Sequence, residues 1–259
     1  MARTHDVSIT GHVLTKRYTS WSRNEHRVEW AVLQTVSAAT HDRVPTPLYA
    51  DLEAAPPSVS MTLLPGRPLE GSLSAAELDA LELALRELWS VRADELPQLA
   101  PESTADLARR QGLLASWEGS GIVGEAHALA HEWLCGPQAE QLLVPCPETV
   151  VGHGDPNLSN YLWDGSRVRI VDFEDAGRSD PALELANLVE HISARETDWA
   201  GFVSRFSIDP ARFAAARCLW ATFWLTLLRP GGRSNDRNPP GTAERQAERL
   251  ITLLAHCSS

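Results

Sequence analysis

The hydrophobic pattern of this chain changes character near residue 66, and this change limits the folds that the chain can adopt. Residues 7–18 contain short β-branched runs on either side of a Thr-Gly-His turn, which is typical of a β-hairpin. Beyond residue 71, leucines recur every three or four positions, as they do on one face of an α-helix. We therefore expect an α+β chain with a β-rich part over residues 1–66 and a mainly helical part over residues 67–259.

The β-rich part also contains the signals for one helix and a further strand. Asn24 can cap a helix that runs to about residue 38, with valines at four-residue spacing along one face. Pro45 and Pro47 then break the chain, and an apolar extended run over residues 58–64 predicts a strand. A Pro-Gly pair ends this run, so we expect a hinge there.

The helical part contains several helix starts and a second group of strands. Ser74 and Glu77 form a capping box, in which each side chain satisfies a free backbone N–H of the other residue. A strand that begins at residue 149 leads into a polar loop, and a hairpin with a tight turn at Asp164-Gly165 follows. Further helices are expected over residues 104–117, 122–143, 210–228 and 242–256, with one more that begins at Pro181.

The charge balance excludes some classes of partner. The chain carries 23 lysines and arginines against 34 aspartates and glutamates, a formal net charge of −11. Binding to nucleic acid or to an anionic membrane needs a cationic surface, so we expect neither as a partner. No run approaches the ~20 apolar residues that span a bilayer, and the first residues lack the apolar core of a signal peptide. We therefore expect a cytoplasmic chain with four reduced cysteines.

Lys16 is the single lysine of a chain that has 22 arginines. Arginine fills nearly every other cationic position, so a retained lysine points to a site that needs a compact ammonium on a flexible stem. Coding bias with chance survival of one lysine is the alternative, and the place of Lys16 in the fold decides between the two.

The segment from His153 to Asp175 carries the most chemical information. Asp155 and Asn160 lie five residues apart on one loop, and Asp172 is expected to end the last strand of the hairpin that follows. The oxygen atoms of all three side chains can therefore converge at one end of a small sheet. One carboxylate can accept a proton from a hydroxyl, while a second carboxylate and an amide oxygen are hard ligands that suit Mg²⁺. These parts match phosphoryl transfer, in which a protein orients a nucleophile and holds a metal-bound triphosphate.

In this segment the chain resembles the aminoglycoside phosphotransferases and the choline-kinase-like small-molecule kinases, which are relatives of the protein kinases. The shared pattern is His-Gly-Asp, four residues, Asn, and then Asp-Phe-Glu-Asp; residues 151–190 match it closely and residues 16–66 more loosely. The resemblance implies a bilobal protein-kinase-like fold. Residues 1–66 would form a small nucleotide-binding lobe, and residues 67–259 a larger helical lobe with the catalytic loop, the metal-binding loop and the substrate site.

The same resemblance implies roles for individual residues of the second lobe. Asp155 corresponds to the catalytic carboxylate that orients and deprotonates the substrate hydroxyl, and Asn160 and Asp172 correspond to the Mg²⁺ ligands. His153 is expected to support the catalytic loop by hydrogen bonding. Glu174 is expected to support the site rather than to bind the metal.

For the first lobe, the resemblance implies that Lys16 lies on the strand whose lysine holds the α- and β-phosphates. Its expected partner is Glu29 on the following helix, and Glu25, one turn earlier, is the competitor. Glu29, with Leu33 four residues further on, fits the family's Glu-x-x-x-Leu spacing.

The remaining nucleotide contacts would involve the base. Met61 and Leu63 resemble the linker whose backbone meets the adenine edge, and Leu162 falls where an apolar residue lies beneath the adenine. The implied activity is transfer of the γ-phosphate of ATP or GTP, with Mg²⁺, to a hydroxyl of a polar and even cationic small molecule, either a metabolite or an antibiotic.

The chain departs from this family ahead of Lys16. The small lobe normally has two strands and a glycine-rich phosphate loop before that lysine. Here one hairpin occupies residues 7–18, and Gly11 is the sole glycine before Lys16. We therefore expect the first strand and the phosphate lid to be missing or reduced. A start further upstream, a replaced lid and weakened nucleotide binding all stay open.

Two rival functions follow from these observations. A kinase-like binding module without catalysis would account for the shortened start of the chain. A metal-dependent hydrolase that uses His153, Asp155 and Asp172 would leave the sole lysine unexplained. The identity of the acceptor would depend on helices over residues 71–143 and 194–256, and their sequence does not specify it.

Overall fold

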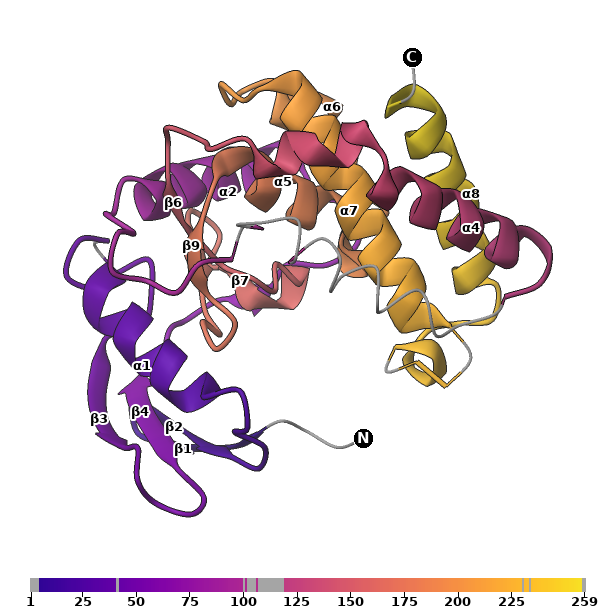
Figure 1. The fold of residues 1–259 in the computed structure, drawn as a ribbon. Helices are drawn as coiled ribbons and strands as arrows, with labels where there is room; N and C mark the ends of the chain where they lie inside the picture. The colour runs from indigo at the N-terminus through magenta and orange to yellow at the C-terminus, as the bar shows by residue number, and fades with distance from the viewer. Residues whose placement is uncertain are drawn as a thin grey trace. The chain divides into compact units, whose positions relative to one another are not determined.

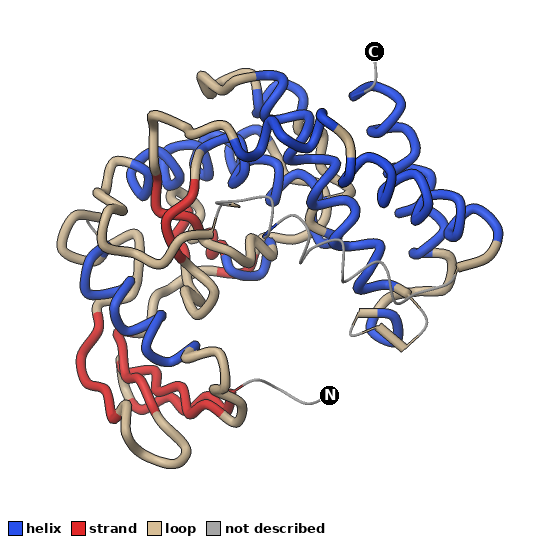
Figure 2. The backbone as a smooth tube through the Cα atoms, in the orientation of Figure 1, coloured by secondary structure: helices blue, strands red, loops and turns tan. Residues whose placement is uncertain are grey.

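The chain folds into two units, each built from segments that are distant in sequence. The computed structural model describes residues 5–40, 42–99, 101, 106, 119–229, 231–232 and 234–257. In the described residues, every strand belongs to the first unit (Figures 1 and 2). The first unit comprises Met1–Leu99, Glu148–Asp180 and Glu196–Phe202, and the second comprises Ala100–Pro147, Pro181–Arg195 and Val203–Ser259.

The first unit begins with a four-stranded antiparallel sheet in the order β1-β2-β4-β3. β1 (His5–Thr10) and β2 (Val13–Tyr18) form the hairpin that the sequence predicts. Gly11 lies in its turn at a φ of 59°, a left-handed conformation that glycine adopts without strain. β4 (Ser58–Thr62) pairs with β2 and confirms the strand expected over residues 58–64, although it ends two residues earlier.

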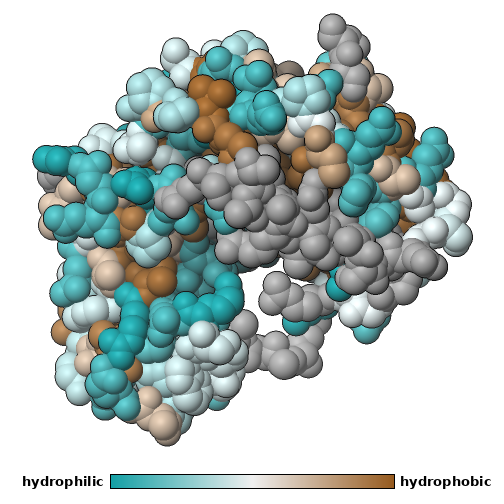
Figure 3. Space-filling model, in the orientation of Figure 1, coloured by the Kyte–Doolittle hydropathy of each residue, from teal (hydrophilic) through white to brown (hydrophobic). Residues whose placement is uncertain are grey.

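The fourth strand, β3 (Pro47–Asp51), is absent from the sequence-based prediction, which treats the prolines there as a break. β3 pairs only with β4 in the described sheet, so it is an edge strand. Pro47, its first residue, lacks a backbone N–H, and the start of an edge strand is where a sheet tolerates this. The edge strands β1 and β3 leave some apolar side chains exposed, and Figure 3 shows such hydrophobic patches separated by hydrophilic surface.

Helix α1 (Glu25–Val36) packs on this sheet through contacts with β3 and β4 (Figure 1). Asn24 occupies the N-cap position as predicted, but with a φ of 62° and no side-chain capping bond. The buried face of the helix includes Glu29 as well as Val32 and Val36. A carboxylate on a buried face needs a cation or hydrogen-bond donors nearby. Glu29 therefore requires such a partner within the core of this unit.

The rest of the first unit contains two smaller sheets and a long helix. β5 (Arg67–Pro68), β7 (Tyr161–Trp163) and β8 (Val168–Ile170) form one sheet in the order β5-β7-β8. α2 (Ala75–Trp89) contacts β8 and begins with the predicted capping box of Ser74 and Glu77. The other sheet pairs β6 (Val150–Gly152) with β9 (Gly177–Ser179), a strand that the sequence analysis did not predict.

The second hairpin differs from its prediction in two details. Its turn has four residues rather than two, because the Asp164 side chain accepts hydrogen bonds from the backbone N–H groups of Ser166 and Arg167 and holds an open loop. β8 also ends at Ile170, so Asp172 lies beyond the strand instead of at its end. Asp172 has a φ of 72°, a left-handed conformation that is uncommon outside glycine.

The second unit is a helical bundle with a continuous apolar core. Three described helices of this unit confirm their predictions: one covers residues 210–228, one covers residues 242–257, and one begins at Pro181. The helix expected over residues 122–143 is instead interrupted at Gly136-Pro137, where the backbone is extended before a short 3-10 helix. The prediction over residues 104–117 lies outside the described residues apart from Asp106. The helices are α4 (Gly121–Cys135), η1 (Pro137–Leu143), α5 (Pro181–Glu190), η3 (Ile192–Ala194), α7 (Pro210–Leu228), η4 (Asn235–Arg237) and α8 (Thr242–Cys257).

The described residues also contain two short segments, the 3-10 helix η2 (Leu158–Asn160) in the polar loop and the helix α6 (Ala200–Val203). Side chains from α4, α5, α7 and α8 form the core of the second unit, with Trp133, Leu219 and Leu250 among its buried members. Within the described residues, no helix is long and apolar enough to cross a membrane.

Glu190, at the end of α5, is a buried carboxylate at the centre of the second unit. It is fully buried and accepts hydrogen bonds from Arg195 at 2.7 Å, from Arg217 at 2.7 Å and from Arg249 at 2.5 and 2.9 Å. Burial alone would raise the pKa of Glu190, but the hydrogen bonds and charges of the arginines lower it below its ordinary value of 4.5. This carboxylate therefore ties α5, α7 and α8 together.

Replacing Glu190 with alanine is expected to destabilise the chain by about 3–5 kcal/mol, because it leaves three partly buried guanidinium groups without their shared anion. Urea unfolding at pH 7 measures this. The exposed Glu248 on α8 is the matched control, and Glu248→Ala is expected to change the free energy of unfolding by no more than about 0.5 kcal/mol. Equal costs for the two variants would contradict the assigned role of Glu190.

The lowered pKa of Glu190 predicts that the folded chain loses stability in acid. In the unfolded chain Glu190 takes up a proton as the pH falls below about 4.5, whereas in the folded chain it resists protonation. The free energy of unfolding should therefore fall as the pH falls through the folded pKa. Urea titrations between pH 7 and pH 3 should show a shallower fall for Glu190→Gln than for the unaltered chain; identical slopes would show that Glu190 does not contribute.

Candidate active site

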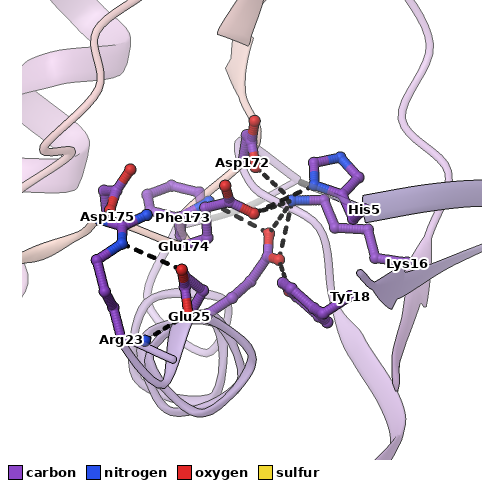
Figure 4. Close-up of polar contacts among 10 residues, drawn as sticks. His5, Lys16, Tyr18, Arg23, Glu25, Asp172, Phe173, Glu174 and Asp175 are labelled. Carbon is purple, nitrogen blue, oxygen red and sulfur yellow. Dashed lines mark hydrogen bonds and ion pairs between the residues drawn. The ribbon is translucent and has the colours of Figure 1, made fainter. Parts of the chain in front are cut away.

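The ammonium of Lys16 on β2 is buried among carboxylates of the first unit (Figure 4). Its Nζ atom lies 2.8 and 2.9 Å from the two carboxylate oxygens of Glu29 on α1. It also donates a hydrogen bond to Asp172 and lies 3.9 Å from an oxygen of Glu174. Burial alone would lower the pKa of Lys16, but the charges of Glu29 and Asp172 outweigh it and raise that pKa. Lys16 is therefore a fixed cation.

Of the two glutamates that the sequence offers as partners, Glu29 is the one that contacts Lys16. Glu25 instead accepts a hydrogen bond from Arg23 at 3.1 Å. Arg23 also donates to Asp175 at 2.6 Å, which connects the start of α1 to the segment that follows Asp172. This second ion pair is exposed at the arginine, so its energy is small compared with the buried pair.

Two residues that the sequence analysis did not identify complete the polar cluster. The Tyr18 hydroxyl donates a hydrogen bond to Glu29, and burial, assisted by the charge of Glu29, raises the pKa of Tyr18. The Nδ1 atom of His5 lies 3.3 Å from Glu174. Tyr18 is two residues from Lys16 on the same strand, so strand alternation could have placed both on one face. The place of His5 in this cluster depends on the strand register that pairs it with Tyr18, which the sequence does not give.

Hydrogen bonds from the polar loop hold the backbone immediately before Asp172. The N–H of Val171 donates to the carbonyl of Asn160 at 2.9 Å, and the carbonyl of Val171 lies 2.8 Å from the Nε2 atom of His153. These bonds stabilise the left-handed conformation of Asp172, which would otherwise cost energy in an unrestrained loop. His153 thus supports the site through the backbone.

The residue after Asp172 is held from the other side. The N–H of Phe173 donates to Glu29 at 3.2 Å, so one carboxylate contacts both Lys16 and the backbone next to Asp172. The Phe173 ring is fully buried, with its centroid 5.2 Å from that of His153. Asp172 itself keeps 26% of its side chain exposed, so it can still meet a ligand.

The polar loop presents Asp155 on a rigid backbone. The carbonyl of Asp155 accepts hydrogen bonds from the N–H of Asn157 at 2.8 Å and from the side-chain amide of Asn160 at 3.0 Å. Gly154 has a φ of 79°, and a Cβ atom there would lie 1.9 Å from the carbonyl oxygen of Asp175. Glycine is therefore required next to Asp155, and the loop is packed directly against the segment that follows Asp172.

The side chain of Asp155 is half-buried and belongs to the same electrostatic environment as Asp175. Burial raises the pKa of Asp175 although Arg23 opposes it, and the carboxylates of Glu174 and Asp155 add to the rise. The acids of the two loops are therefore close enough to interact.

The residues expected to contact the base lie on two neighbouring segments of the first unit. Met61 is buried in β4, whereas Leu63 is 37% exposed and its N–H donates to the carbonyl of His12 at 2.8 Å. Leu162 is half-buried in β7, and a Cβ atom on Gly66 would lie 3.0 Å from its Cβ. The segment that follows β4 therefore runs beside Leu162.

The donor set fits a divalent cation. One carboxylate oxygen from each of Glu29, Asp172 and Glu174 lies within 4.8 Å of the other two, and Lys16 is the sole lysine available to balance them. The side-chain amide of Asn160 donates to Asp155, while no described residue donates to its Oδ1 atom. Carboxylate and amide oxygens with spare lone pairs are the ligands that Mg²⁺ takes, so Asp172 and Asn160 suit a magnesium site.

Sequence comparison now identifies the class of protein. The model of the phosphotransferase enzyme family matches residues 11–220, and the chain belongs to this family. No curated protein matches the chain in sequence.

Solved structures with low sequence identity share the fold. A choline/ethanolamine kinase family protein from Mesorhizobium loti is 17% identical, with a TM-score of 0.66 over 100% of this chain and 85% of that one. The GDP complex of aminoglycoside 2′-phosphotransferase-IIIa is 14% identical, with a TM-score of 0.68 over 99% and 91%. Choline kinase LicA from Streptococcus pneumoniae is 12% identical, with a TM-score of 0.66 over 99% and 91%. The predicted protein-kinase-like fold and family resemblance are confirmed.

The buried pair of Lys16 and Glu29 predicts strong energetic coupling. Lys16→Met should destabilise the chain by about 3 kcal/mol, because it leaves the fully buried Glu29 carboxylate without its cation. The double variant with Glu29→Gln should be more stable than the sum of the single effects by about 1–3 kcal/mol. Urea unfolding of the four proteins of this cycle measures the coupling.

Arg17, the exposed neighbour of Lys16 on β2, provides the control. Arg17→Met combined with Glu29→Gln should give additive effects, because the Arg17 side chain lies on the face of β2 opposite to that of Lys16 and Glu29. Additivity in the Lys16 cycle as well would mean that the ion pair does not stabilise the fold.

Proposed function

We propose that this chain is a small-molecule kinase that transfers the γ-phosphate of ATP or GTP, with Mg²⁺, to a hydroxyl group of a polar acceptor. A single observation carries the proposal: the buried Lys16 ammonium donates hydrogen bonds to Glu29 and Asp172, directly beside the loop of Asp155 and Asn160. A fixed ammonium, oxygen ligands for a metal and a half-buried carboxylate are the parts that phosphoryl transfer needs.

In this proposal the nucleotide binds with its phosphates at Lys16. The ammonium keeps its proton because the neighbouring carboxylates raise its pKa, so it can attract the α- and β-phosphates. Glu29 orients Lys16, and the Tyr18 hydroxyl donates a hydrogen bond to the same carboxylate. Structures with this fold are named as complexes of ADP, GDP and ATP, which supports a nucleoside triphosphate as donor.

The base would lie between the segment after β4 and Leu162. Met61 and Leu63 belong to that segment, and their backbone would meet the polar edge of the base while Leu162 covers one apolar face. Both purine nucleotides present such an edge, so ATP and GTP stay equal candidates for the donor.

Asp172 and Asn160 would hold Mg²⁺ through a carboxylate oxygen and through Oδ1. The bound ion would neutralise part of the charge that develops on the transferred phosphoryl group. The protein contributes the position of these ligands: the backbone of Asp172 is fixed by His153 and Asn160, and Glu174 stands next to the site, 3.9 Å from Lys16.

Asp155 would accept a hydrogen bond from the acceptor hydroxyl, align it with the γ-phosphate and take up its proton. The rigid loop keeps the carboxylate in one place, so most of the rate enhancement would come from alignment and charge stabilisation rather than from covalent chemistry. Solved structures with this fold include one named as a choline kinase and one named as an aminoglycoside phosphotransferase. We therefore propose hydroxyl-bearing small molecules, cationic ones and antibiotics included, as acceptors in the cytoplasm.

Asp155→Asn is expected to lower turnover by about 10²–10⁴-fold while the affinity for Mg²⁺-ATP stays within about twofold, because it removes a proton acceptor and leaves the nucleotide contacts in place. An ATPase-coupled screen of aminoglycosides, amino alcohols and sugars finds the acceptor, and steady-state kinetics then measure the effect.

Asp94→Asn, which alters an exposed carboxylate paired with Arg92, is the control and should leave turnover unchanged. Near-normal turnover of Asp155→Asn would refute the assigned role. Nucleotide binding by the unaltered chain without turnover of any acceptor would favour the non-catalytic binding module instead.

Asn160→Ala should raise the Mg²⁺ concentration for half-maximal activity by at least the ~10-fold that loss of an outer ligand partner costs. The reason is that the substitution removes Oδ1, the acceptor that no described residue uses. A magnesium titration at saturating ATP measures the shift, with the exposed Gln34→Ala on α1 as control. An unchanged magnesium requirement would remove Asn160 from the metal site.

A further inference from the structure

Two of the four cysteines meet in the second unit, although 39 residues separate them in sequence. The Sγ atoms of Cys218 on α7 and Cys257 on α8 lie 3.0 Å apart. The spacing of the cysteines along the chain gives no sign of this pair, because the packing of α8 along α7 creates it. Cys135 and Cys146 belong to other segments of the same unit, so the chain contains its own control thiols.

The two thiols of the pair have different surroundings. Cys218 is fully buried in the core of the second unit, whereas Cys257 is half-buried at the last residue of α8. A reagent from solution therefore reaches Cys257 first. Cys218 lies behind it, within contact of its sulfur and shielded from direct attack.

The electrostatics give the accessible thiol the greater reactivity. The hydrogen bond with Cys218 lowers the pKa of Cys257 to about 7, against the effect of burial, and the charges of Arg217 and His256 lower it further. The same hydrogen bond and burial raise the pKa of Cys218. Cys257 therefore forms the thiolate, the nucleophilic form of cysteine, more readily than Cys218 does.

We propose that Cys218 and Cys257 form a thiol–disulfide exchange site that reacts with small-molecule disulfides and closes a reversible covalent link between α7 and α8. This proposal is independent of the proposed kinase activity. It concerns a reaction of the second unit alone, and none of its residues belongs to the candidate active site.

The exchange takes two steps. The Cys257 thiolate attacks one sulfur of a small disulfide RSSR, forming a Cys257–S–SR mixed disulfide and releasing RS⁻. The Cys218 thiol then loses its proton to solvent and attacks the Cys257 sulfur, forming the Cys218–Cys257 disulfide and releasing a second RS⁻. The two cysteines are oxidised by two electrons, and the small disulfide is reduced to two thiols.

The fold already aligns the helices for this link. Gln246 on α8 donates to the carbonyl of Ala221 on α7 at 2.7 Å, and Arg249 on α8 contacts Glu190 at the end of α5. The first half of α8 is therefore anchored to α7 and α5, and the disulfide would extend that anchoring to the final residue of the helix.

The test uses the purified full-length chain, equilibrated with mixtures of oxidised and reduced glutathione and quenched with acid. The chain is then unfolded in denaturant, free thiols are alkylated with one reagent, and thiols released by later reduction are alkylated with a second reagent before peptide mass mapping. Cys218 and Cys257 should lose the first label together and to the same extent, with a linked peptide that excess dithiothreitol removes. Persistence of both free thiols, or glutathione adducts without a linked peptide, would overturn the proposal.

Variants exclude other pairings. Cys257→Ser carries the test because it alters the half-buried partner, whereas a substitution of the buried Cys218 can disturb the core. In Cys257→Ser, Cys218 should stay a free thiol, while the double variant of Cys135→Ser and Cys146→Ser should form the link as the unaltered chain does. A disulfide of Cys218 with another cysteine in Cys257→Ser, or loss of the link in the double variant, would contradict the assignment.

Discussion

The buried ammonium of Lys16 is the constraint on which the first unit depends. An unpaired charge is costly to bury, so a lysine at 5% exposure requires carboxylates around it, and the fully buried Glu29 requires a cation in turn. Meeting both requirements brings together β2, α1 and the segment that contains Asp172. The segment that contains Asp172 lies far from β2 and α1 in sequence, so a polar interaction joins distant parts of the chain at the centre of the site.

The carboxylates outnumber the cation, and the surrounding backbone is fixed. Glu29 contacts both Lys16 and the N–H of Phe173, while His153 and Asn160 hold the peptide groups of Val171. The site is thus organised before a ligand arrives, which lowers the cost of ordering on binding. Its negative excess favours a divalent cation, and its single ammonium favours the phosphate groups that such a cation accompanies.

The hairpin, α1 and the polar loop follow from the sequence because their signals are local: strand alternation, capping residues and glycines. The lone Lys16 and the acids of the two loops were also visible there. What sequence reasoning missed depends on long-range pairing. β3 and β9 are short strands that exist through their partners, His5 reaches Glu174 through the register of β1, and α7–α8 packing joins two cysteines. No local pattern encodes such contacts.

Calorimetric titration of the full-length chain with Mg²⁺-ATP and Mg²⁺-GTP tests the central claim most directly, namely that the buried ammonium is where a nucleoside triphosphate binds. The account predicts saturable binding by the unaltered chain and a loss of about 10–100-fold in affinity for Lys16→Met, equivalent to one charged hydrogen bond. Arg17→Met should bind as the unaltered chain does. Absence of binding heat at millimolar nucleotide, or equal affinity for Lys16→Met and Arg17→Met, would contradict it.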